Sequence, residues 1–198
     1  MNLNLMLKIA HRINTTEALD ATPRNLGVEM DLHAFGDRLT VHHDAFVEGI
    51  PFERWLDHYR HAFVILNIKE EGIEARVREM VLARGIEDFF MLDLSFPALI
   101  RMTRTGEKRV AVRVSEYEAV ASADALKGQA GWVWLDVFRG FPISRDDHDT
   151  LRKGGFRLCL VSPELHGQDI AEIARMQAEM KRLGCSVDAV CTKHPDLW

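Results

Sequence analysis

The sequence predicts an α/β protein with the fold of a (β/α)8 TIM barrel, in which eight parallel strands alternate with helices. Short apolar segments rich in Val, Ile, Leu and Phe recur along the chain, as expected of strands covered on both faces, and helical patterns separate most of them. Polar residues collect near the C-terminal ends of these segments, where such barrels carry their functional loops. With 198 residues, the chain is at the small end for this fold.

Nine segments have the composition of strands. They are residues 7–12, 27–32, 38–44, 63–69, 89–95, 109–115, 132–138, 156–162 and 186–193. The segment 38–44 follows its predecessor too closely for a helix to intervene, and Gly36-Asp37 between them is typical of a turn. We therefore expect a small β-hairpin arm after the second strand, which leaves eight strands for the barrel.

Helical patterns fit the intervals between these strands. They cover residues 15–22, 52–61, 70–84, 96–104, 115–127, 144–153 and 168–183. Ile73, Val77 and Val81 have helical spacing, and Gly184 is a suitable C-cap for the last helix. Ser115 and Ser144 are expected N-caps.

The composition is that of one globular domain over residues 1–198, with 47% hydrophobic residues and a net charge of -5. No long basic run is present, so we expect no nucleic-acid partner. No stretch is long enough for a membrane span, and the N-terminal residues are expected to lead directly into the first strand. We expect Cys159, Cys185 and Cys191 to be reduced core residues, which favours a cytoplasmic location.

Paired polar residues mark the ends of several predicted strands. The pairs are Glu29 and Asp31, Asn67 and Lys69, Asp93 and Ser95, and Arg113 and Ser115. Members of each pair are two residues apart, so they point to the same face of their strand. His11, Arg12, His43, Asp44 and Asp136 also lie at or near strand ends. His42 points away from His43 and is expected to be structural, and His33 is a weaker site candidate.

Glu29 and Asp31 cannot both be buried and charged without a positive partner. A hard divalent cation, Mg²⁺ or Ca²⁺, is one partner that suits oxygen ligands. Ion pairs with Arg12, Lys69 or Arg113 are the alternative, and the residues alone leave both open. Arg113 and Asp136 are expected either to form an ion pair with each other or to make extra contacts with the substrate.

The order of these motifs resembles the glycerophosphodiester phosphodiesterase family. The similar segments are "IAHRI" with "NT" at 9–15, "GVEMDL" at 27–32, "LTVHHD" at 39–44, "ILNIK" at 65–69, "LSFPALIRM" at 94–102 and "VDAVCTKHPDLW" at 187–198. They correspond to the family's His-Arg-Gly, Glu-x-Asp, His-Asp, Glu-x-Lys, Ser-Phe and Thr-Asp-x-Pro motifs. The matches span nearly the whole chain, and His-Arg, Glu-x-Asp and His-Asp in order are the most specific.

The resemblance implies a (β/α)8 barrel that hydrolyses a small phosphodiester with one divalent cation and two histidines. It assigns the acid–base pair to His11 and His43, phosphate binding to Arg12 and Lys69, and metal ligation to Glu29, Asp31 and Asn67. Arg113 is a further candidate for phosphate binding, and Asp136 and Asp93 are further candidates for metal ligation. We expect a small-molecule phosphodiester as the partner, with no nucleic acid and no membrane span, and the oligomeric state is not predicted.

Four departures from the family pattern bear on function. Ile13 replaces the Gly of His-Arg-Gly, Asn67 replaces a carboxylate, a short segment follows His43-Asp44 in place of an insertion, and Val161-Ser162 replaces Trp-Thr. An amide oxygen still coordinates a cation, but with one negative charge less. The sequence thus also allows a catalytically altered barrel that binds a phosphate ester, or a lyase that releases a cyclic phosphate.

Overall fold

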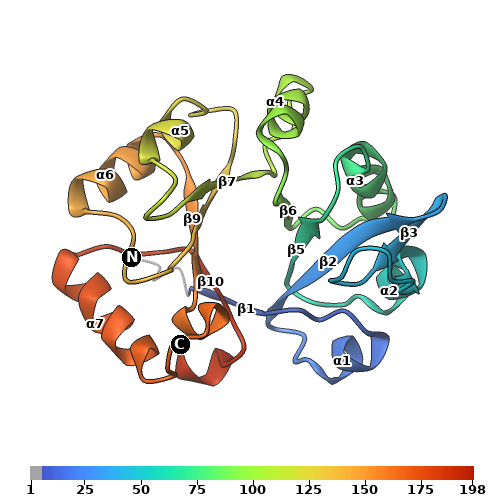
Figure 1. Cartoon of the computed structure of the whole chain (residues 1–198), viewed down its shortest axis with the longest axis horizontal. Coiled ribbons are helices and arrows are strands. Elements are labelled where there is room, and N and C mark those ends of the chain that lie inside the picture. The colour runs from blue at the N-terminus through green and yellow to red at the C-terminus, as the bar shows by residue number, and fades with distance from the viewer. Residues whose placement is uncertain (1–5) are drawn as a thin grey trace. The chain divides into compact units, whose positions relative to one another are not determined.

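Apolar segments form the strands of the structure, a computed structural model that describes residues 6–198 (Figure 1). The expected lead-in over residues 1–5 lies outside the described residues. The strands are β1 Leu7–Ala10, β2 Gly27–Phe35, β3 Arg38–Val41, β4 Ile50–Pro51, β5 Phe63–Ile68, β6 Phe89–Leu92, β7 Ala111–Val114, β8 Trp132–Leu135, β9 Arg157–Val161 and β10 Ala189–Thr192. The nine predicted strand segments are therefore present, and the two-residue strand β4 was not predicted.

Helices follow most of the strands. They are α1 Thr16–Ala21, α2 Phe52–His58, α3 Glu74–Leu82, α4 Phe96–Arg104, α5 Val120–Asp124, α6 Arg145–Lys153 and α7 Glu172–Leu183, with 3-10 turns η1 Pro163–His166 and η2 Pro195–Leu197. None of the described helices is long and apolar enough to cross a membrane.

The strand pairing is that of a (β/α)8 barrel. β1 pairs in parallel with β2, β2 with β5, and β5 with β6. Met91 of β6 forms a parallel bridge with Val110, next to the start of β7. β7, β8, β9 and β10 then pair in parallel in chain order, and β10 lies beside β1. The fold class predicted from the sequence is confirmed.

The contacts within the chain define two units, which are described separately. One unit comprises residues 9–110, and the other comprises residues 111–198 with the first residues of β1. The expectation of a single domain over residues 1–198 stays a prediction.

The hairpin arm predicted after the second strand is formed by β2, β3 and β4 in the first unit. β2 and β3 pair antiparallel from Leu32–Val41 to Phe35–Arg38, and Gly36 has φ +64° in the turn. β4 adds a second antiparallel pair to β3. This pairing extends β2 past residue 32, because the turn returns the chain alongside it.

Two of the three predicted helix caps are confirmed. Ser144 and Asp147 form a reciprocal capping box at α6, and Gly184 ends α7 with φ +66°. The prediction that Ser115 is an N-cap is wrong, because α5 begins at Val120. The Ser115 hydroxyl donates instead to the Glu118 carboxylate and accepts from the backbone N–H of Tyr117, in the turn before the helix.

The cores of both units contain the apolar residues that the pattern predicted. Trp55, Phe89 and Phe90 are fully buried in the first unit, and Trp132 and Trp134 are buried in the second. Packing is therefore the role of the two tryptophans of β8. Cys159, Cys185 and Cys191 are all buried, as expected.

Candidate active site

Glu29 and Asp31 form the centre of a polar cluster on β2. Alternation along the strand directs both side chains to one face, and each residue is about 1% exposed. Asn67 of β5 is the register partner of Asp31, so its side chain lies on the same face of the neighbouring strand. The pairing of β2 with β5 therefore brings together two carboxylates and an amide that are far apart in sequence.

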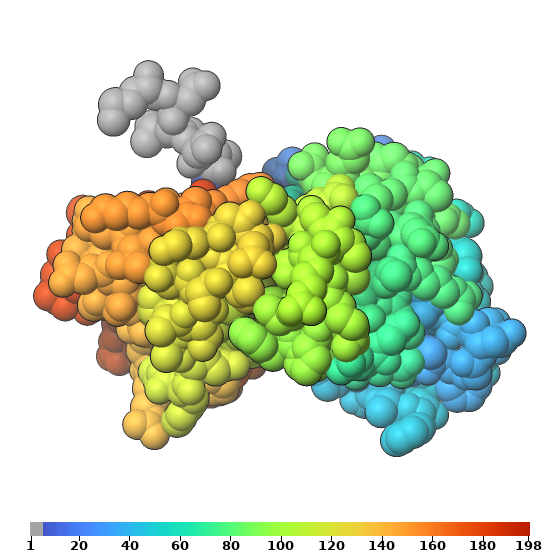
Figure 2. All heavy atoms as spheres, turned by 90° about the horizontal axis from the view of Figure 1, so that it is seen from above, coloured from blue at the N-terminus to red at the C-terminus, as the bar shows by residue number. Residues whose placement is uncertain are grey.

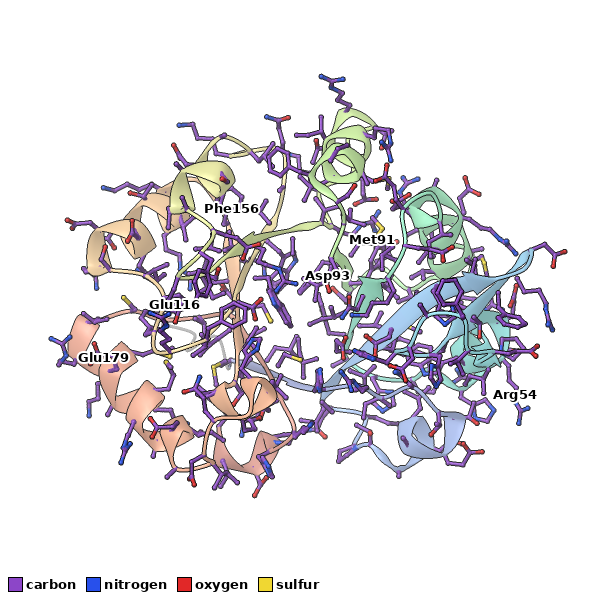
Figure 3. All side chains as sticks on the ribbon, in the orientation of Figure 1. Arg54, Met91, Asp93, Glu116, Phe156 and Glu179 are labelled. Carbon is purple, nitrogen blue, oxygen red and sulfur yellow. The ribbon has the colours of Figure 1, made fainter. Side chains whose placement is uncertain are left out.

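Protein donors surround both carboxylates. Glu29 accepts hydrogen bonds from the Asn67 side-chain amide at 2.8 Å and from the Arg12 backbone N–H at 2.7 Å. Asp31 accepts from the Asn14 amide at 2.7 Å, and Lys69 Nζ lies 3.1 Å from its other oxygen. Lys69 also contacts Asp93, which follows β6, at 3.4 Å. Asp93 is labelled in Figure 3. The ion-pair alternative from the sequence is thus present for Lys69.

The charges at Glu29 are incompletely balanced. Burial and then repulsion by Asp31 raise the pKa of Glu29 to about 7, although the hydrogen bonds from Asn67 and Arg12 oppose the shift. A raised pKa in a cluster of this kind is typical of a functional site, because folding alone does not favour two adjacent buried carboxylates.

His11 and Arg12 follow β1 and close this cluster. His11 Nε2 lies 3.7 Å from Glu29 Oε2, and Arg12 Nε lies 3.8 Å from Asp31 Oδ2. Arg12 has φ +58°, a left-handed conformation that is uncommon for a non-glycine residue. This conformation lets the backbone N–H groups of Arg12 and Ile13 both bond Glu29, the first to its side chain and the second to its carbonyl at 2.7 Å.

His43 lies in the loop after β3, beside an open pocket of about 600 Å³. The pocket is also lined by Arg12 and Asn14, which contact Asp31 from the pocket side. His43 Nδ1 bonds the Asp44 carboxylate at 2.7 Å, and this hydrogen bond lowers the pKa of Asp44. His42 also lines the pocket and accepts from the Asp44 backbone N–H at 3.0 Å.

Arg113 and Asp136 lie in the second unit, where they form an ion pair with each other. Asp136 is about 1% exposed and also bonds His166 Nε2 at 2.7 Å. Burial and then the charge of Arg113 lower the pKa of His166. The bridge that the sequence offered as one reading of Arg113 and Asp136 is thus present, together with a histidine that the sequence did not single out.

The structure brings six predicted residues into one cluster in the first unit. They are His11, Arg12, Glu29, Asp31, Asn67 and Lys69. His43 shares a pocket with Arg12, and Arg113 and Asp136 belong to the other unit. Sequence reasoning missed Asn14 and His166. Asn14 is in the Asn-Thr motif already noted, and His166 follows a strand end, so position offered a weak signal for both.

His33 lies on the same face of β2 as Glu29 and Asp31, but its side chain contacts Ala34 and His42. Its Nδ1 donates to the Ala34 carbonyl at 2.9 Å, and the residue is about 2% exposed. Its ring meets that of His42 edge to face, with 6.5 Å between the centroids. No contact links it to the carboxylates among the interactions of the described residues.

The chain has the fold of glycerophosphodiester phosphodiesterases. The crystal structure of such an enzyme from Agrobacterium tumefaciens aligns with a TM-score of 0.67 and 17% identity, over 98% of this chain and 98% of that chain. A glycerophosphoryl diester phosphodiesterase from Parabacteroides distasonis aligns with a TM-score of 0.66 and 13% identity, over 100% and 86% of the two chains. No family model and no curated protein matches the sequence.

Proposed function

We propose that the protein hydrolyses a small phosphodiester, with histidine acid–base chemistry and a divalent cation. The observation that carries the proposal is the cluster of Glu29, Asp31, Asn67, Lys69 and Arg12, in the part of β2 that pairs with β5 and at the C-terminal ends of β1 and β5. Its members occupy the motif positions that the resemblance assigned to metal and phosphate. The shared fold of the phosphodiesterases from Agrobacterium and Parabacteroides supports the same reading.

The donor set fits a hard cation. Glu29, Asp31 and Asn67 offer oxygen atoms from one face of two paired strands, as Mg²⁺ or Ca²⁺ requires. Asn67 Oδ1 is buried and has no hydrogen-bond partner among the described residues, so one acceptor at the cluster is left over. Within residues 6–198, no three His, Cys, Asp or Glu side chains are arranged to hold a metal. A cation bound by Glu29 and Asp31 would therefore need the Asn67 amide oxygen as its third protein ligand. A bound cation would supply charge stabilisation for the phosphoryl oxygens.

Side chains of the protein would bind the phosphate and transfer the protons. Arg12 and Lys69 offer positive charge to the nonbridging oxygens of the diester, whose charge grows during the reaction. In the proposed reaction, a substrate hydroxyl next to the ester loses its proton to one histidine and attacks phosphorus. The leaving alkoxide takes a proton from the other histidine, which gives a cyclic phosphate and a free alcohol. Water then opens the cycle to a phosphomonoester. His11 and His43 are the proposed pair.

The test is turnover of glycerophosphocholine, which carries the neighbouring hydroxyl, with Mg²⁺ or Ca²⁺, followed by phosphorus NMR. We expect His11→Ala and His43→Ala each to lower kcat by about 10²- to 10⁴-fold and to keep cation binding, measured by calorimetry. His61→Ala is the matched control, because His61 bonds the Thr22 carbonyl and has no contact with the carboxylates. Full activity of His11→Ala would refute the assigned acid–base pair.

One observation favours a second candidate, a barrel that binds a phosphate ester without turnover. Each carboxylate oxygen of Glu29 and Asp31 already lies near a protein donor, so the cluster holds together without a cation. Under this alternative, wild-type protein binds glycerophosphocholine in calorimetry but does not hydrolyse it with any divalent cation. Turnover by the wild type excludes it.

A further inference from the structure

The loop between β3 and β4 presents apolar side chains to solvent beside the candidate site. Phe46 is 95% exposed and Val47 is 42% exposed. Exposed apolar residues in adjacent positions do not help a chain to fold, and they often mark a binding surface. Figure 2 shows this part of the chain, in light blue and cyan, at the surface of its unit.

Phe46 is also held in an unfavourable backbone conformation. Its φ is +64°, which bulky residues rarely adopt and which costs on the order of 1 kcal/mol. Glycine at this position would avoid both the strain and the exposed apolar side chain. The structure therefore retains a strained, solvent-exposed phenylalanine next to the pocket.

The ends of the loop are anchored. Gly49 packs so closely on β3 that a Cβ atom would lie 2.1 Å from the Val41 carbonyl oxygen. Glu48 forms an ion pair with Arg38 at 2.5 Å, and Asp44 bonds both His42 and His43. The loop is thus tied to β3 at Glu48 and Gly49, is held at its other end by the bonds of Asp44 to His42 and His43, and presents Phe46 and Val47 between these anchors.

The residues on either side of this apolar tip line the pocket described above. Asp44 and Glu48 border it together with Arg12 and His43. Phe46 does not itself line the pocket, but it lies in the segment between Asp44 and Glu48, which do, so a ligand with its phosphate at Arg12 and His43 reaches Phe46 by extending past the rim of the pocket. Covering an exposed phenylalanine with hydrocarbon is favourable, whereas a hydrated polyol gains nothing there.

We propose that the substrate is an amphiphilic phosphodiester, with an alkyl or acyl chain that covers Phe46 and Val47. This inference rests on the proposed function and narrows its substrate class. The chain lies away from the reacting phosphorus, so its contact adds binding to substrate and transition state equally. The preference for the chain is therefore expected in KM and not in kcat.

The test compares two diesters that differ only in the chain, glycerophosphocholine and monomeric 1-octanoyl-glycerophosphocholine. We expect the wild type to show a kcat/KM at least about tenfold higher for the octanoyl compound. Phe46→Ser should remove most of that difference through KM and leave glycerophosphocholine turnover unchanged. Phe46→Leu should keep it, because leucine restores an apolar side chain.

Phe96→Ser is the matched control, since Phe96 is 53% exposed in the same unit but lies at the start of α4, outside the segment between Asp44 and Glu48 that borders the pocket. Equal preference of the wild type for the two diesters would overturn the proposal, as would an equal loss in Phe96→Ser. Binding to phosphatidylcholine vesicles tests whether the loop contacts a lipid bilayer instead of a substrate chain. If Phe46→Ser loses only vesicle binding, the loop contacts a bilayer and the proposal is wrong.

Failure of the proposed function can be recognised separately. Octylphosphocholine is a phosphodiester without a neighbouring hydroxyl, so its binding is measured without turnover by calorimetry. If the wild type hydrolyses neither diester but binds octylphosphocholine at least about tenfold more tightly than methylphosphocholine, and Phe46→Ser removes this difference, the substrate class stands and the reaction fails. Equal binding of the two overturns the substrate class.

Discussion

Two buried glutamates in the first unit have opposite electrostatic environments. Glu107 is about 4% exposed and is held by Arg109 and Arg78, with N–O distances between 2.6 and 2.8 Å. Burial alone would raise its pKa, but the hydrogen bonds from Arg109 and Arg78 outweigh burial and lower it to about 2. Glu29 is equally inaccessible, but its neighbour is another carboxylate and its pKa is raised to about 7.

The difference separates a stabilising ion pair from a candidate site. Two guanidinium groups neutralise the Glu107 carboxylate and occupy its oxygens with hydrogen bonds, so this carboxylate is not available to a cation or a substrate. Glu29 receives hydrogen bonds from neutral groups, and Lys69 is shared between Asp31 and Asp93. Burying a charge without full compensation lowers the stability of the folded protein. We therefore infer that Glu29 and Asp31 are kept for a function and not for stability.

Replacing the carboxylates should give the largest effect. Glu29→Gln and Asp31→Asn are expected to lower diester turnover by about 10²-fold or more, because both remove negative charge at the proposed cation site. Neither should lower the unfolding midpoint by more than a few degrees, since each relieves carboxylate repulsion. Steady-state kinetics and thermal unfolding measure the two effects. If Glu29→Gln destabilises the protein and leaves turnover intact, Glu29 is structural and the comparison fails.

The opposite outcome is expected at Glu107. Glu107→Gln should lower the free energy of unfolding by roughly 2 to 4 kcal/mol, because it leaves two arginines without their buried partner. Turnover at a temperature where the variant is folded should match the wild type. Urea titration gives the stability change, and Glu53→Gln is a control at an exposed acid of the same unit. A loss of turnover in folded Glu107→Gln would show that the two glutamates are not distinct in role.

The stability contribution of Glu107 should depend on pH. The pKa of Glu107 is about 2 in the folded chain, compared with 4.5 for an unperturbed glutamate. The stabilisation is therefore present above about pH 5 and is lost as pH falls toward 2. The difference in unfolding free energy between wild type and Glu107→Gln should therefore shrink by roughly 2 to 3 kcal/mol between pH 6 and pH 2.5. Denaturant titrations at both pH values measure it. A constant difference would contradict the ion-pair assignment.

Restoring a carboxylate at the site should give the smallest effect. Asn67→Glu is expected to raise the affinity for Mg²⁺ or Ca²⁺ by about tenfold, because it adds a negative ligand. Without cation, the variant should be less stable than the wild type, since it places a third carboxylate beside Glu29 and Asp31. Calorimetry and thermal unfolding with and without the cation check both statements. Unchanged affinity would argue against Asn67 as a ligand.

The sequence predicted the strands well but placed several of their ends too late. β1 ends at Ala10 and β6 at Leu92, whereas the composition suggested residues 12 and 95. Arg12 and Asp93 have φ values of +58° and +60°, and this left-handed conformation takes the chain out of the ladder. Side-chain composition carries little information about such local backbone changes in non-glycine residues.

The sequence by itself determined which segments become strands and that Glu29 and Asp31 share a face, because burial pattern and two-residue alternation are local properties. It also indicated the fold through the order of its motifs. Only the tertiary structure decided which donors hold these carboxylates, that Asp136 pairs with both Arg113 and His166, and that Phe46 stands exposed beside the pocket. Those contacts join residues 17 to 38 positions apart, or depend on loop conformation. They are set by strand register and packing, which no short stretch of sequence specifies.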